Sequence, residues 1–277
     1  MIHAFTVDVE DWYDGIPIAA ATKASAERRL ERGLNPLLEL LAAKNCRATF
    51  FILGPIAAQY PSLVCTIRDQ GHELGCHGWS HDLIYTMTPR RFSEETRRAS
   101  QTIEDVTGRP VLAYRAAYFS ITTEALWAFD VLAGLGFRYD SSVFPVRNWR
   151  YGIGDFNPSP QVIATASGGI LEFPLSVRRV VGQNIPACGG AYFRIYPYWF
   201  THANIRHAEQ HGRPANFYMH PWELDASHPY VAFNWKAWMT HYVNLAATAP
   251  RLERLLEDFS FAPLGEVLEH ELARSGS

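Results

Sequence analysis

Residues 71–82, GHELGCHGWSHD, place two histidines, His77 and His81, four positions apart directly after a short strand-like run. Residues four apart share one face of a helical turn, so both imidazoles can reach one metal ion. The glycines at positions 71, 75 and 78 indicate close backbone approach around them. Histidine pairs at this spacing are common by chance, and in isolation such a pair is more often a surface accident. The stretch needs a third ligand from elsewhere in the chain.

A second stretch, residues 6–12 (TVDVEDW), ends the first expected strand in three carboxylates. On an extended segment Asp8 and Glu10 share parity and can face one cavity, whereas Asp11 points elsewhere or begins a turn. Carboxylates held close push one another's pKa values apart unless a metal ion absorbs the charge. Two imidazoles and a carboxylate are the ligand set of a catalytic divalent metal, with the second carboxylate left as general base. A solvated acidic turn explains the same residues without a metal.

Between residues 2 and 141, apolar runs and amphipathic segments alternate at a spacing of roughly 30 residues, which is typical of βαβ units and predicts an α/β fold with a parallel sheet or barrel. After residue 142 the rhythm breaks, and residues 144–169 are expected to form a long loop. The expected strands are residues 2–8, 47–53, 72–76, 111–115, 137–141, 170–175 and 215–220. The expected helices are residues 24–45, 55–70, 88–108, one capped by Thr122, 198–211, and 235–259 with an interruption near Pro250.

The composition describes an ordinary globular chain. Its 277 residues are 48% hydrophobic and 19% charged, and the formal net charge of −3 gives no reason to expect nucleic acid as a partner. The four cysteines show no CxxC spacing, which makes a disulfide framework unexpected. We recognise neither a secretory signal nor an apolar run long enough to span a membrane, so we expect a cytoplasmic protein.

Five polar residues fall at or just after expected strand ends. In parallel α/β folds the carboxyl ends of the strands converge on the functional site, so a shared location predicts shared function. A single such residue is more often a satisfied turn residue. The five are Asp8, His77, Arg115, Asp140 and His220.

These motifs resemble the polysaccharide deacetylases of the NodB-homology type (carbohydrate esterase family 4), above all the subgroup that accompanies exosortase and exopolysaccharide genes. Residues 77–81 (HGWSH) match the metal-binding motif and residues 219–223 (MHPWE) match the last motif. Residues 8–10 resemble the first motif, with one residue between base and ligand where adjacent aspartates are usual. Residues 115–118 (RAAY) resemble the third motif without its prolines, and residues 140–142 lie where the fourth is expected. Further similarity covers residues 172–174, 189–194 and 234–264, and so nearly the whole chain.

The resemblance implies a distorted (β/α)7-type barrel of mainly parallel strands, built as a single domain over residues 1–277 with a C-terminal helical extension from about residue 222. It also implies that Glu10, His77 and His81 bind Zn²⁺ or a similar divalent ion such as Co²⁺, Ni²⁺ or Mn²⁺. The departure in the first motif leaves Glu10 and Asp11 both open as the acidic ligand.

The implied reaction is metal-assisted removal of acetyl groups from an N-acetylated glycan, a polysaccharide or its oligosaccharide precursor. Asp8, held by Arg115, would take a proton from the metal-bound water. The Tyr118 backbone N–H would help to hold the oxyanion, and His220 would protonate the leaving sugar amine. The sequence leaves open the glycan, the choice between N-acetyl and O-acetyl groups, the metal, the role of Asp140 and the oligomeric state.

Three other interpretations compete with this one. A cyclic-amide or purine-ring hydrolase on the same scaffold would need no metal. A glycosidase could use Asp8 with Glu10 or Asp11, but would leave both histidines unexplained. A carbohydrate-binding relative without catalytic activity would tolerate the departures at Glu10, Ala116 and Ala117.

Overall fold

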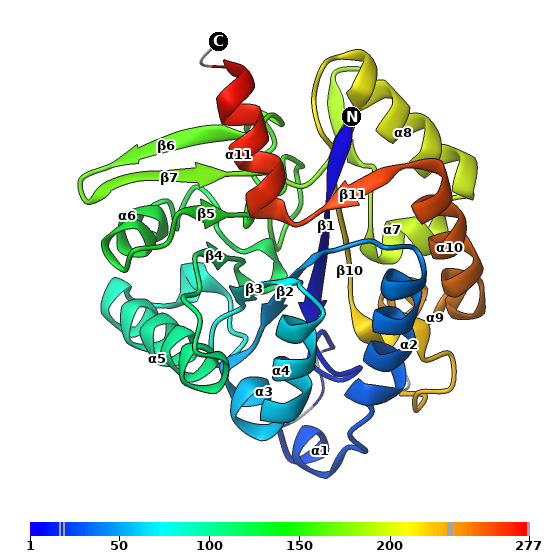
Figure 1. Cartoon of the computed structure of the whole chain (residues 1–277), viewed down its shortest axis with the longest axis horizontal. Helices are drawn as coiled ribbons and strands as arrows, with labels where there is room; N and C mark the ends of the chain where they lie inside the picture. Colours follow the sequence, from blue (N-terminus) through cyan, green and yellow to red (C-terminus); the bar gives the residue numbers. More distant parts are fainter. Residues whose placement is uncertain (17, 19, 232–234, 276–277) are drawn as a thin grey trace.

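The computed structural model describes residues 1–275 except 17, 19 and 232–234, and they form one curled sheet surrounded by helices (Figure 1). The sheet has the strand order β10-β1-β2-β3-β4-β5-β7-β6, with β11 also paired to β1. Every neighbouring pair is parallel except β6–β7, which is antiparallel. The strands are β1 (Ile2–Val9), β2 (Thr49–Ile52), β3 (Glu73–Cys76), β4 (Ala113–Tyr114), β5 (Tyr139–Asp140), β6 (Gln161–Thr165), β7 (Gly168–Glu172), β10 (Asn216–Met219) and β11 (Ser260–Ala262), beside a separate hairpin of β8 (Val177–Val180) and β9 (Gln183–Pro186).

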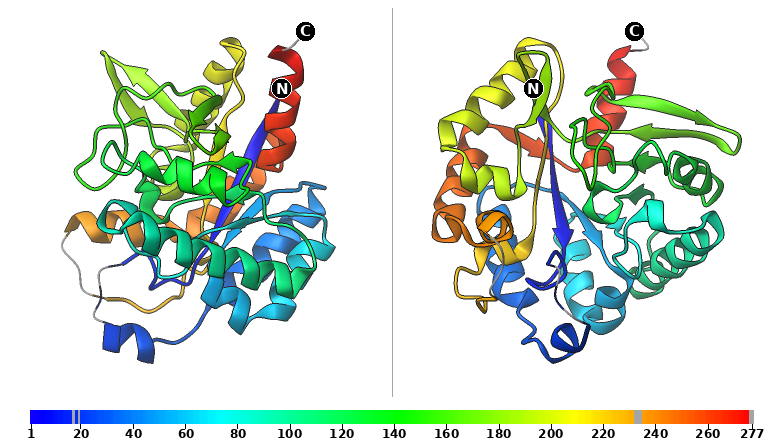
Figure 2. Two further views of the ribbon diagram at one scale, coloured as in Figure 1. Left: turned by 90° about the vertical axis from the view of Figure 1, so that its left-hand side faces the viewer. Right: turned by 180° about the vertical axis from the view of Figure 1, so that it is seen from behind.

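Helices follow most of the parallel strands and cover the convex face of the sheet (Figure 2). The helices are α1 (Ala20–Ser25), α2 (Leu30–Ala43), α3 (Gly54–Gln59), α4 (Pro61–Asp69), α5 (Pro89–Thr107), α6 (Trp127–Gly134), α7 (Gly190–Ile195), α8 (Tyr198–Gln210), α9 (Trp235–Tyr242), α10 (Thr248–Asp258) and α11 (Leu264–Ser275). Short 3₁₀ turns are η1 (Ile84–Thr86), η2 (Ala117–Phe119), η3 (Pro221–Leu224) and η4 (Leu245–Ala247).

The alternation of side chains along β1 separates the helix-facing core from the interior of the curled sheet. Phe5, Val7 and Val9 are buried in the main core, which they share with the surrounding helices. Burying each of these side chains stabilises the fold by roughly 1.5–3 kcal/mol. Ala4 and Asp8 lie on the opposite face of the strand. Ala4 packs in a second cluster with residues of α11. The strand therefore carries its catalytic candidate on the inner face and at its carboxyl end.

The curled sheet is not closed by strand pairing between β10 and β7 in the described part of the chain. The Asn216 side chain bridges this opening instead, with Nδ2 donating to the Phe173 carbonyl and to Ser141 Oγ, both at 2.9 Å. The predicted α/β fold of mainly parallel strands is confirmed, and the barrel is an open one.

Two expected helices begin or divide differently from the prediction. The helix expected over residues 24–45 begins at Leu30, because the Asp11 carboxylate accepts hydrogen bonds from the N–H groups of Arg29 and Leu30. The helix expected over residues 55–70 is divided into α3 and α4 before Pro61, a residue that disfavours helical geometry in its predecessor, Tyr60. The expected cap at Thr122 is also wrong, since α6 begins at Trp127.

The second half of the chain contains more regular structure than its composition indicates. The expected loop over residues 144–169 includes β6, which pairs with β7 as a hairpin. Pro250 lies in the first turn of α10, and the break in the terminal helical region comes earlier, where Asn244 has a φ of 53°. The elements α7, β8, β9, β11 and α11 were not expected. Asn234, where the similarity to the family's closing region begins, lies outside the described residues.

Candidate metal centre

The carboxyl ends of β1, β3, β4 and β10 bring together residues that are far apart in the sequence. Asp8 lies near the end of β1, and His77, Arg115 and His220 directly follow β3, β4 and β10. Parallel pairing aligns these strand ends at one edge of the sheet, which places the four side chains around one cavity. This convergence was predicted from the sequence.

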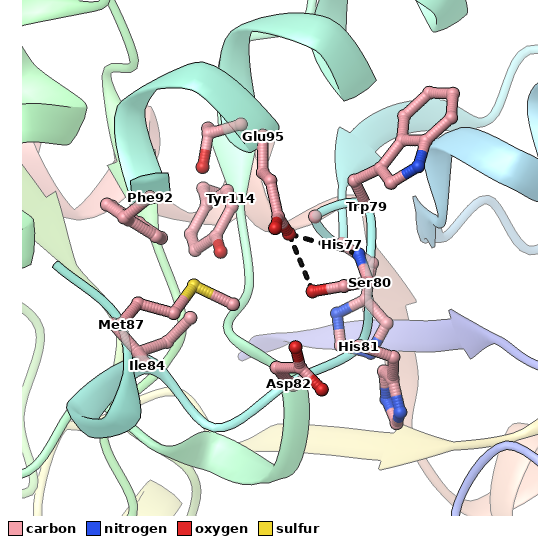
Figure 3. A pocket seen from close by; sticks show the side chains of 13 residues that line it. His77, Trp79, Ser80, His81, Asp82, Ile84, Met87, Phe92, Glu95 and Tyr114 are labelled. Carbon is pink, nitrogen blue, oxygen red and sulfur yellow. Dashed lines mark hydrogen bonds between the residues drawn. The ribbon is translucent and has the colours of Figure 1, made fainter. Parts of the chain in front are cut away.

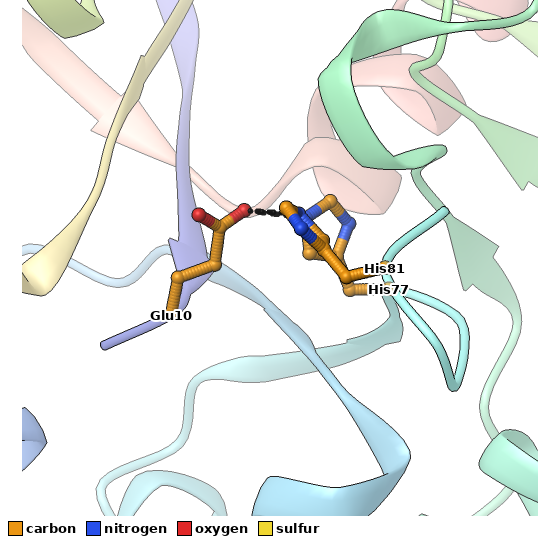
Figure 4. Close-up of side chains that lie close together, drawn as sticks. All are labelled: Glu10, His77 and His81. Atoms are coloured by element: carbon orange, nitrogen blue, oxygen red, sulfur yellow. Dashed lines mark hydrogen bonds and ion pairs between the residues drawn. The ribbon is translucent and has the colours of Figure 1, made fainter. Parts of the chain in front are cut away.

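Glu10 and the two histidines of the HGWSH motif form a compact group (Figure 4). Glu10 Oε1 lies 3.0 Å from His77 Nε2 and 2.8 Å from His81 Nε2. Glu10 and His77 are buried, and only 7% of the His81 side chain is exposed. A group of this kind, with ligand atoms within 4.8 Å of one another, could hold a metal ion.

The hydrogen bonds of His77 indicate that a cation belongs in this group. Its Nδ1 lies 2.8 Å from the Arg115 carbonyl oxygen, which only accepts, so Nδ1 carries the proton. In the neutral ring, Nε2 then presents a lone pair to the Glu10 carboxylate, and two acceptors face each other at 3.0 Å. A divalent cation, or a proton, resolves this contact. The second hydrogen bond of His77 is also the usual way in which a metal-ligating imidazole is oriented.

The charge state of the group agrees with cation binding. Burial alone would raise the pKa of Glu10, but the neighbouring His81 and His220 hold it well below its ordinary value. Glu10 is therefore ionised and can act as a carboxylate ligand. Two imidazole nitrogens and one carboxylate oxygen suit Zn²⁺ and similar divalent ions.

Asp11, the other candidate for the acidic metal ligand, has a structural role. Its Oδ2 accepts hydrogen bonds from the N–H groups of Arg29 at 2.8 Å and Leu30 at 3.2 Å, and Oδ1 accepts one from its neighbour Trp12 at 2.8 Å. These contacts cap the amino-terminal end of α2. The structure thus places Glu10, and not Asp11, beside the two histidines.

The two histidines converge through an irregular loop rather than a helical turn, contrary to the prediction. Gly78 has a φ of 82° and His81 a φ of 57°, and the turns at these positions bring both rings to the same side. The loop is tied to α5 by Glu95, whose Oε2 accepts hydrogen bonds from the Ser80 hydroxyl at 2.6 Å and its backbone N–H at 3.3 Å (Figure 3). Positive φ in a side-chain-bearing residue such as His81 requires this kind of external support.

Asp8 is held by a buried arginine. Arg115 Nη1 donates to Asp8 Oδ1 at 2.8 Å and to Thr6 Oγ1 at 2.9 Å. The same guanidinium donates to the carbonyl and hydroxyl oxygens of Ser141 at 2.9 and 2.7 Å. Both members of the ion pair are almost completely buried. The four contacts orient Asp8 Oδ1 and leave Oδ2 toward the cavity, where His220 Nε2 lies 4.0 Å away.

His220 has its own carboxylate partner, a residue to which the sequence assigned no role. Glu223 Oε1 lies 2.9 Å from His220 Nδ1, and Glu223 Oε2 accepts a 2.6 Å hydrogen bond from Arg194 Nε. Burial alone would lower the pKa of His220, but the carboxylates of Glu10, Glu223 and Asp8 raise it to about 9. His220 is therefore an imidazolium at neutral pH. The three-residue spacing of His220 and Glu223 is a capping-box spacing, a signal that could have identified the pair.

Tyr118 lies beside the metal-ligand candidates. Its ring centroid is 4.6 Å from that of His81, and its hydroxyl donates to the Asp14 carbonyl at 2.9 Å. The residue has a φ of 56°, and Ala116 and Ala117 before it are buried. In the described part of the chain the Tyr118 backbone N–H has no intramolecular acceptor, which leaves it available to a ligand.

Two family models match the chain. Residues 28–139 match the family described as polysaccharide deacetylase, and residues 141–269 match a domain of unknown function, DUF3473. The first match contains His77, His81 and Arg115, and the second contains His220. Residues 28–139 are therefore similar to the polysaccharide deacetylase family. The exosortase-associated subgroup and the C-terminal extension stay predictions.

Curated relatives share part of the sequence of this chain. A peptidoglycan deacetylase of Helicobacter pylori is 31% identical over 116 residues, which are 41% of this chain and 38% of that protein. A chitin deacetylase of a Pestalotiopsis species is 32% identical over 105 residues, 37% of this chain and 34% of that protein. The matched region thus spans well under half of the length of these relatives.

Solved structures share the fold over almost the whole chain. A Mycobacterium smegmatis protein assigned to the polysaccharide deacetylases has a TM-score of 0.69 at 20% identity, covering 98% of this chain and 90% of that one. A family 4 carbohydrate esterase from Streptomyces lividans, solved with acetate, has a TM-score of 0.51 at 17% identity, covering 95% of this chain and 91% of that one. At these identities the likeness shows the fold alone.

Asp140, the strand-end residue of the expected fourth motif, does not contact Asp8 or His220 at the candidate metal centre. It accepts hydrogen bonds from the backbone and hydroxyl of Ser142 at 2.9 and 2.8 Å and lies beside Glu172. Both carboxyl groups are fully buried, and burial followed by the charge of Asp140 raises the pKa of Glu172 well above its ordinary value. Glu172 is therefore protonated and donates to Asp140, which gives its otherwise unpartnered Oε2 a hydrogen bond.

No helix in the described part of the chain combines the length and the apolarity needed to cross a bilayer.

Proposed function

We propose that this protein is a divalent-metal-dependent hydrolase that removes acetyl groups from an N-acetylated polysaccharide or its oligosaccharide precursor. The observation that carries the proposal is the convergence of the Glu10, His77 and His81 ligand atoms beside two acid–base groups, Asp8 and His220. The match to the polysaccharide deacetylase model and the deacetylase activities named for its relatives support this substrate class.

The metal-ligand candidates form one functional unit in this proposal. A divalent ion such as Zn²⁺ held by Glu10, His77 and His81 would act as a Lewis acid toward the acetamido carbonyl. His77 is oriented for this by its bond to the Arg115 carbonyl, and His81 by the loop that Glu95 ties to α5.

Asp8 acts as the general base. The water oxygen adds to the acetamido carbonyl carbon while Asp8 Oδ2 takes the water proton. Arg115 keeps Asp8 in place through Oδ1, so that the free oxygen faces the cavity. The Tyr118 backbone N–H donates to the oxyanion that forms, and an oxyanion donor of this kind typically contributes about 3 kcal/mol to the transition state.

His220 acts as the general acid. Its Nδ1–H donates to Glu223, which leaves Nε2–H on the side of Asp8 and the reacting group. Nε2 gives its proton to the sugar nitrogen as the C–N bond breaks, and acetate and the free amine leave. A pKa of about 9 supplies the protonated ring that this step needs at neutral pH.

Acetate release tests the proposal. The purified protein, loaded with Zn²⁺ or Co²⁺, should release acetate from N-acetylglucosamine oligosaccharides, and His77→Ala and His81→Ala should each abolish both release and stoichiometric metal binding. His270→Ala is the matched control, because that side chain is 62% exposed and lies on α11.

Other outcomes would support the competing interpretations. Shortened glycan without acetate would indicate a glycosidase. Amide hydrolysis that survives chelation and the His77→Ala change would indicate a metal-independent hydrolase. Wild-type protein that binds metal and glycan but releases no acetate would indicate a carbohydrate-binding relative.

A further inference from the structure

We propose that Arg150 forms a subsite for a carboxylate-bearing sugar next to the deacetylation site, so that the substrate is an acidic N-acetylated glycan. The inference rests on the proposed function and specifies its substrate class. Arg150 belongs to the segment 144–156, to which the sequence assigned only a loop. The segment lies in the part of the chain that matches the domain of unknown function.

Arg150 is connected to the candidate metal ligands through one aromatic ring. Its guanidinium carbon lies 3.8 Å from the centroid of the Tyr118 ring, and that ring lies 4.6 Å from the ring of His81. A guanidinium stacked on an aromatic face keeps its N–H donors free at the edge of the plane. The arginine is therefore positioned one side chain away from the metal-ligand candidates.

The charge of Arg150 has no carboxylate counterpart in the described part of the chain. No Asp or Glu oxygen among those residues lies within 4.0 Å of its guanidinium nitrogens, whereas most arginines of the chain that approach the site are paired, such as Arg115 with Asp8 and Arg194 with Glu223. The cavity itself is acidic, and an anionic substrate needs a compensating cation at its entrance. A half-buried arginine without a carboxylate partner suits a carboxylate of the substrate, which it can bind bidentately.

The segment that carries Arg150 is held in place by its surroundings. Tyr85 donates from its hydroxyl to the Arg150 carbonyl at 3.1 Å, and the Arg150 N–H donates to Asn148 Oδ1 at 3.0 Å. The ring of Tyr151 stacks on Phe144, with centroids 5.7 Å apart. These contacts fix the backbone on both sides of Arg150, so the guanidinium is presented by a supported loop.

Trp149, the residue before Arg150 in the sequence, supplies an aromatic surface on the same segment. Its side chain is 91% exposed, in contrast to the buried Trp222. It lines a hollow with residues on either side of Arg150, including Val146 and Gly152. An exposed aromatic ring offers an apolar face for the C–H groups of a sugar ring, and the adjacent arginine offers a partner for its carboxylate. The two side chains together match an acidic sugar better than a neutral one.

A matched pair of substrates tests the subsite. One is a hyaluronan tetrasaccharide, in which N-acetylglucosamine alternates with glucuronate, and the other is the same tetrasaccharide with its carboxylates reduced to alcohols. The metal-loaded wild-type protein should have a kcat/KM on the order of 10-fold or more higher for the acidic form, the size expected for a charge-assisted hydrogen bond pair. Arg150→Met should remove most of this preference by lowering kcat/KM for the acidic form. Arg138→Met, whose exposed guanidinium pairs with Glu269 on the surface, should retain the preference.

Binding measured by the fluorescence of the metal-free protein separates this inference from the proposed function. An acidic preference in binding that Arg150→Met abolishes supports the subsite even if no acetate is released, an outcome that would overturn the deacetylase proposal alone. Equal kcat/KM and equal affinity of the wild type for both tetrasaccharides would overturn the subsite. Two results would assign Arg150 to packing on Tyr118 and would also overturn the subsite. One is an Arg150→Met variant that loses activity equally on both tetrasaccharides. The other is an Arg150→Met variant that no longer folds, together with an Arg150→Lys variant that has no preference for the acidic tetrasaccharide.

Discussion

Glu223 Oε1 accepts hydrogen bonds from both the backbone N–H and the ring Nδ1–H of His220, each at 2.9 Å. The other carboxylate oxygen accepts from Arg194 Nε at 2.6 Å, and both Glu223 and Arg194 are buried. Burial alone would raise the pKa of Glu223, but Arg194 and His220 lower it to about 2. The pair therefore fixes the tautomer, orientation and charge of His220 from a single motif, HPWE.

Glu223→Gln should lower the pKa of His220, because the change removes a negative charge at 2.9 Å. In the metal-free protein, NMR titration of the ring should give a pKa of about 9 for the wild type and a clearly lower value for the variant. The basic limb of the kcat/KM profile should move to lower pH in parallel. An unchanged limb with a lowered ring pKa would exclude His220 as the general acid.

The same pKa shift predicts how stability depends on pH. A histidine with a raised folded pKa contributes stability that is complete below the unfolded value of about 6.5. This contribution is lost as pH rises through about 9, so the free energy of unfolding of the metal-free wild type should decrease between these values. Glu223→Gln should show a smaller decrease in urea titrations over the same window.

Glu10→Gln and Asp11→Asn should separate the two acidic candidates. Glu10→Gln removes an anionic ligand beside both histidines and should weaken Zn²⁺ binding by at least 10-fold in calorimetric titrations. Asp11→Asn should leave metal affinity nearly unchanged, and Asp11→Ala should cost about 1 kcal/mol of stability through loss of the α2 cap. The assignment is wrong if Asp11→Asn loses the metal and Glu10→Gln keeps it.

Arg115→Met should destabilise the protein by about 3–5 kcal/mol, because it leaves the buried Asp8 carboxylate unpaired. Acetate release should fall to background. Arg115→Lys, which keeps the charge but not the fork of donors, should fold better and remain impaired. Chemical denaturation measures the difference, with Arg90→Met on the exposed face of α5 as the control. A loss of stability under 1 kcal/mol in Arg115→Met would contradict the structural role of the ion pair.

Glu172→Gln should make stability less dependent on pH. The folded pKa of Glu172 is raised, so the protonated acid contributes stability below the ordinary carboxyl range and loses it as pH increases. The glutamine variant should therefore gain about 1–3 kcal/mol relative to the wild type on going from pH 5 to pH 9. Glu266→Gln, an exposed change on α11, should show no such trend. Parallel pH curves for Glu172→Gln and the wild type would show that the pair shares no proton.

Local sequence patterns predicted much of the framework of this protein. Apolar runs predicted seven of the eight parallel strands that the structure describes, all except β11. Thr88-Pro89 and Gly108 predicted both ends of α5, where Thr88 Oγ1 caps the helix and Gly108 adopts a φ of 66°. These features can be predicted from the sequence because they depend on residues close to one another in the chain. The strand ends likewise predicted where Asp8, His77, Arg115 and His220 would meet.

Only the tertiary structure decided which groups face one another. Glu10 and Asp11 are adjacent and chemically alike, but Asp11 turns to the N–H groups of Arg29 and Leu30 while Glu10 turns to the histidines. Asp140 is a strand-end acid like Asp8, yet it pairs with Glu172 from the next strand and not with the site. The sequence by itself determined seven of the parallel strands and the residue types at their ends, because these follow from local propensity and periodicity. The acidic ligand, the partner of His220 and the stacking of Arg150 on Tyr118 depend on contacts between residues far apart in the chain, and these contacts exist only once the sheet has curled.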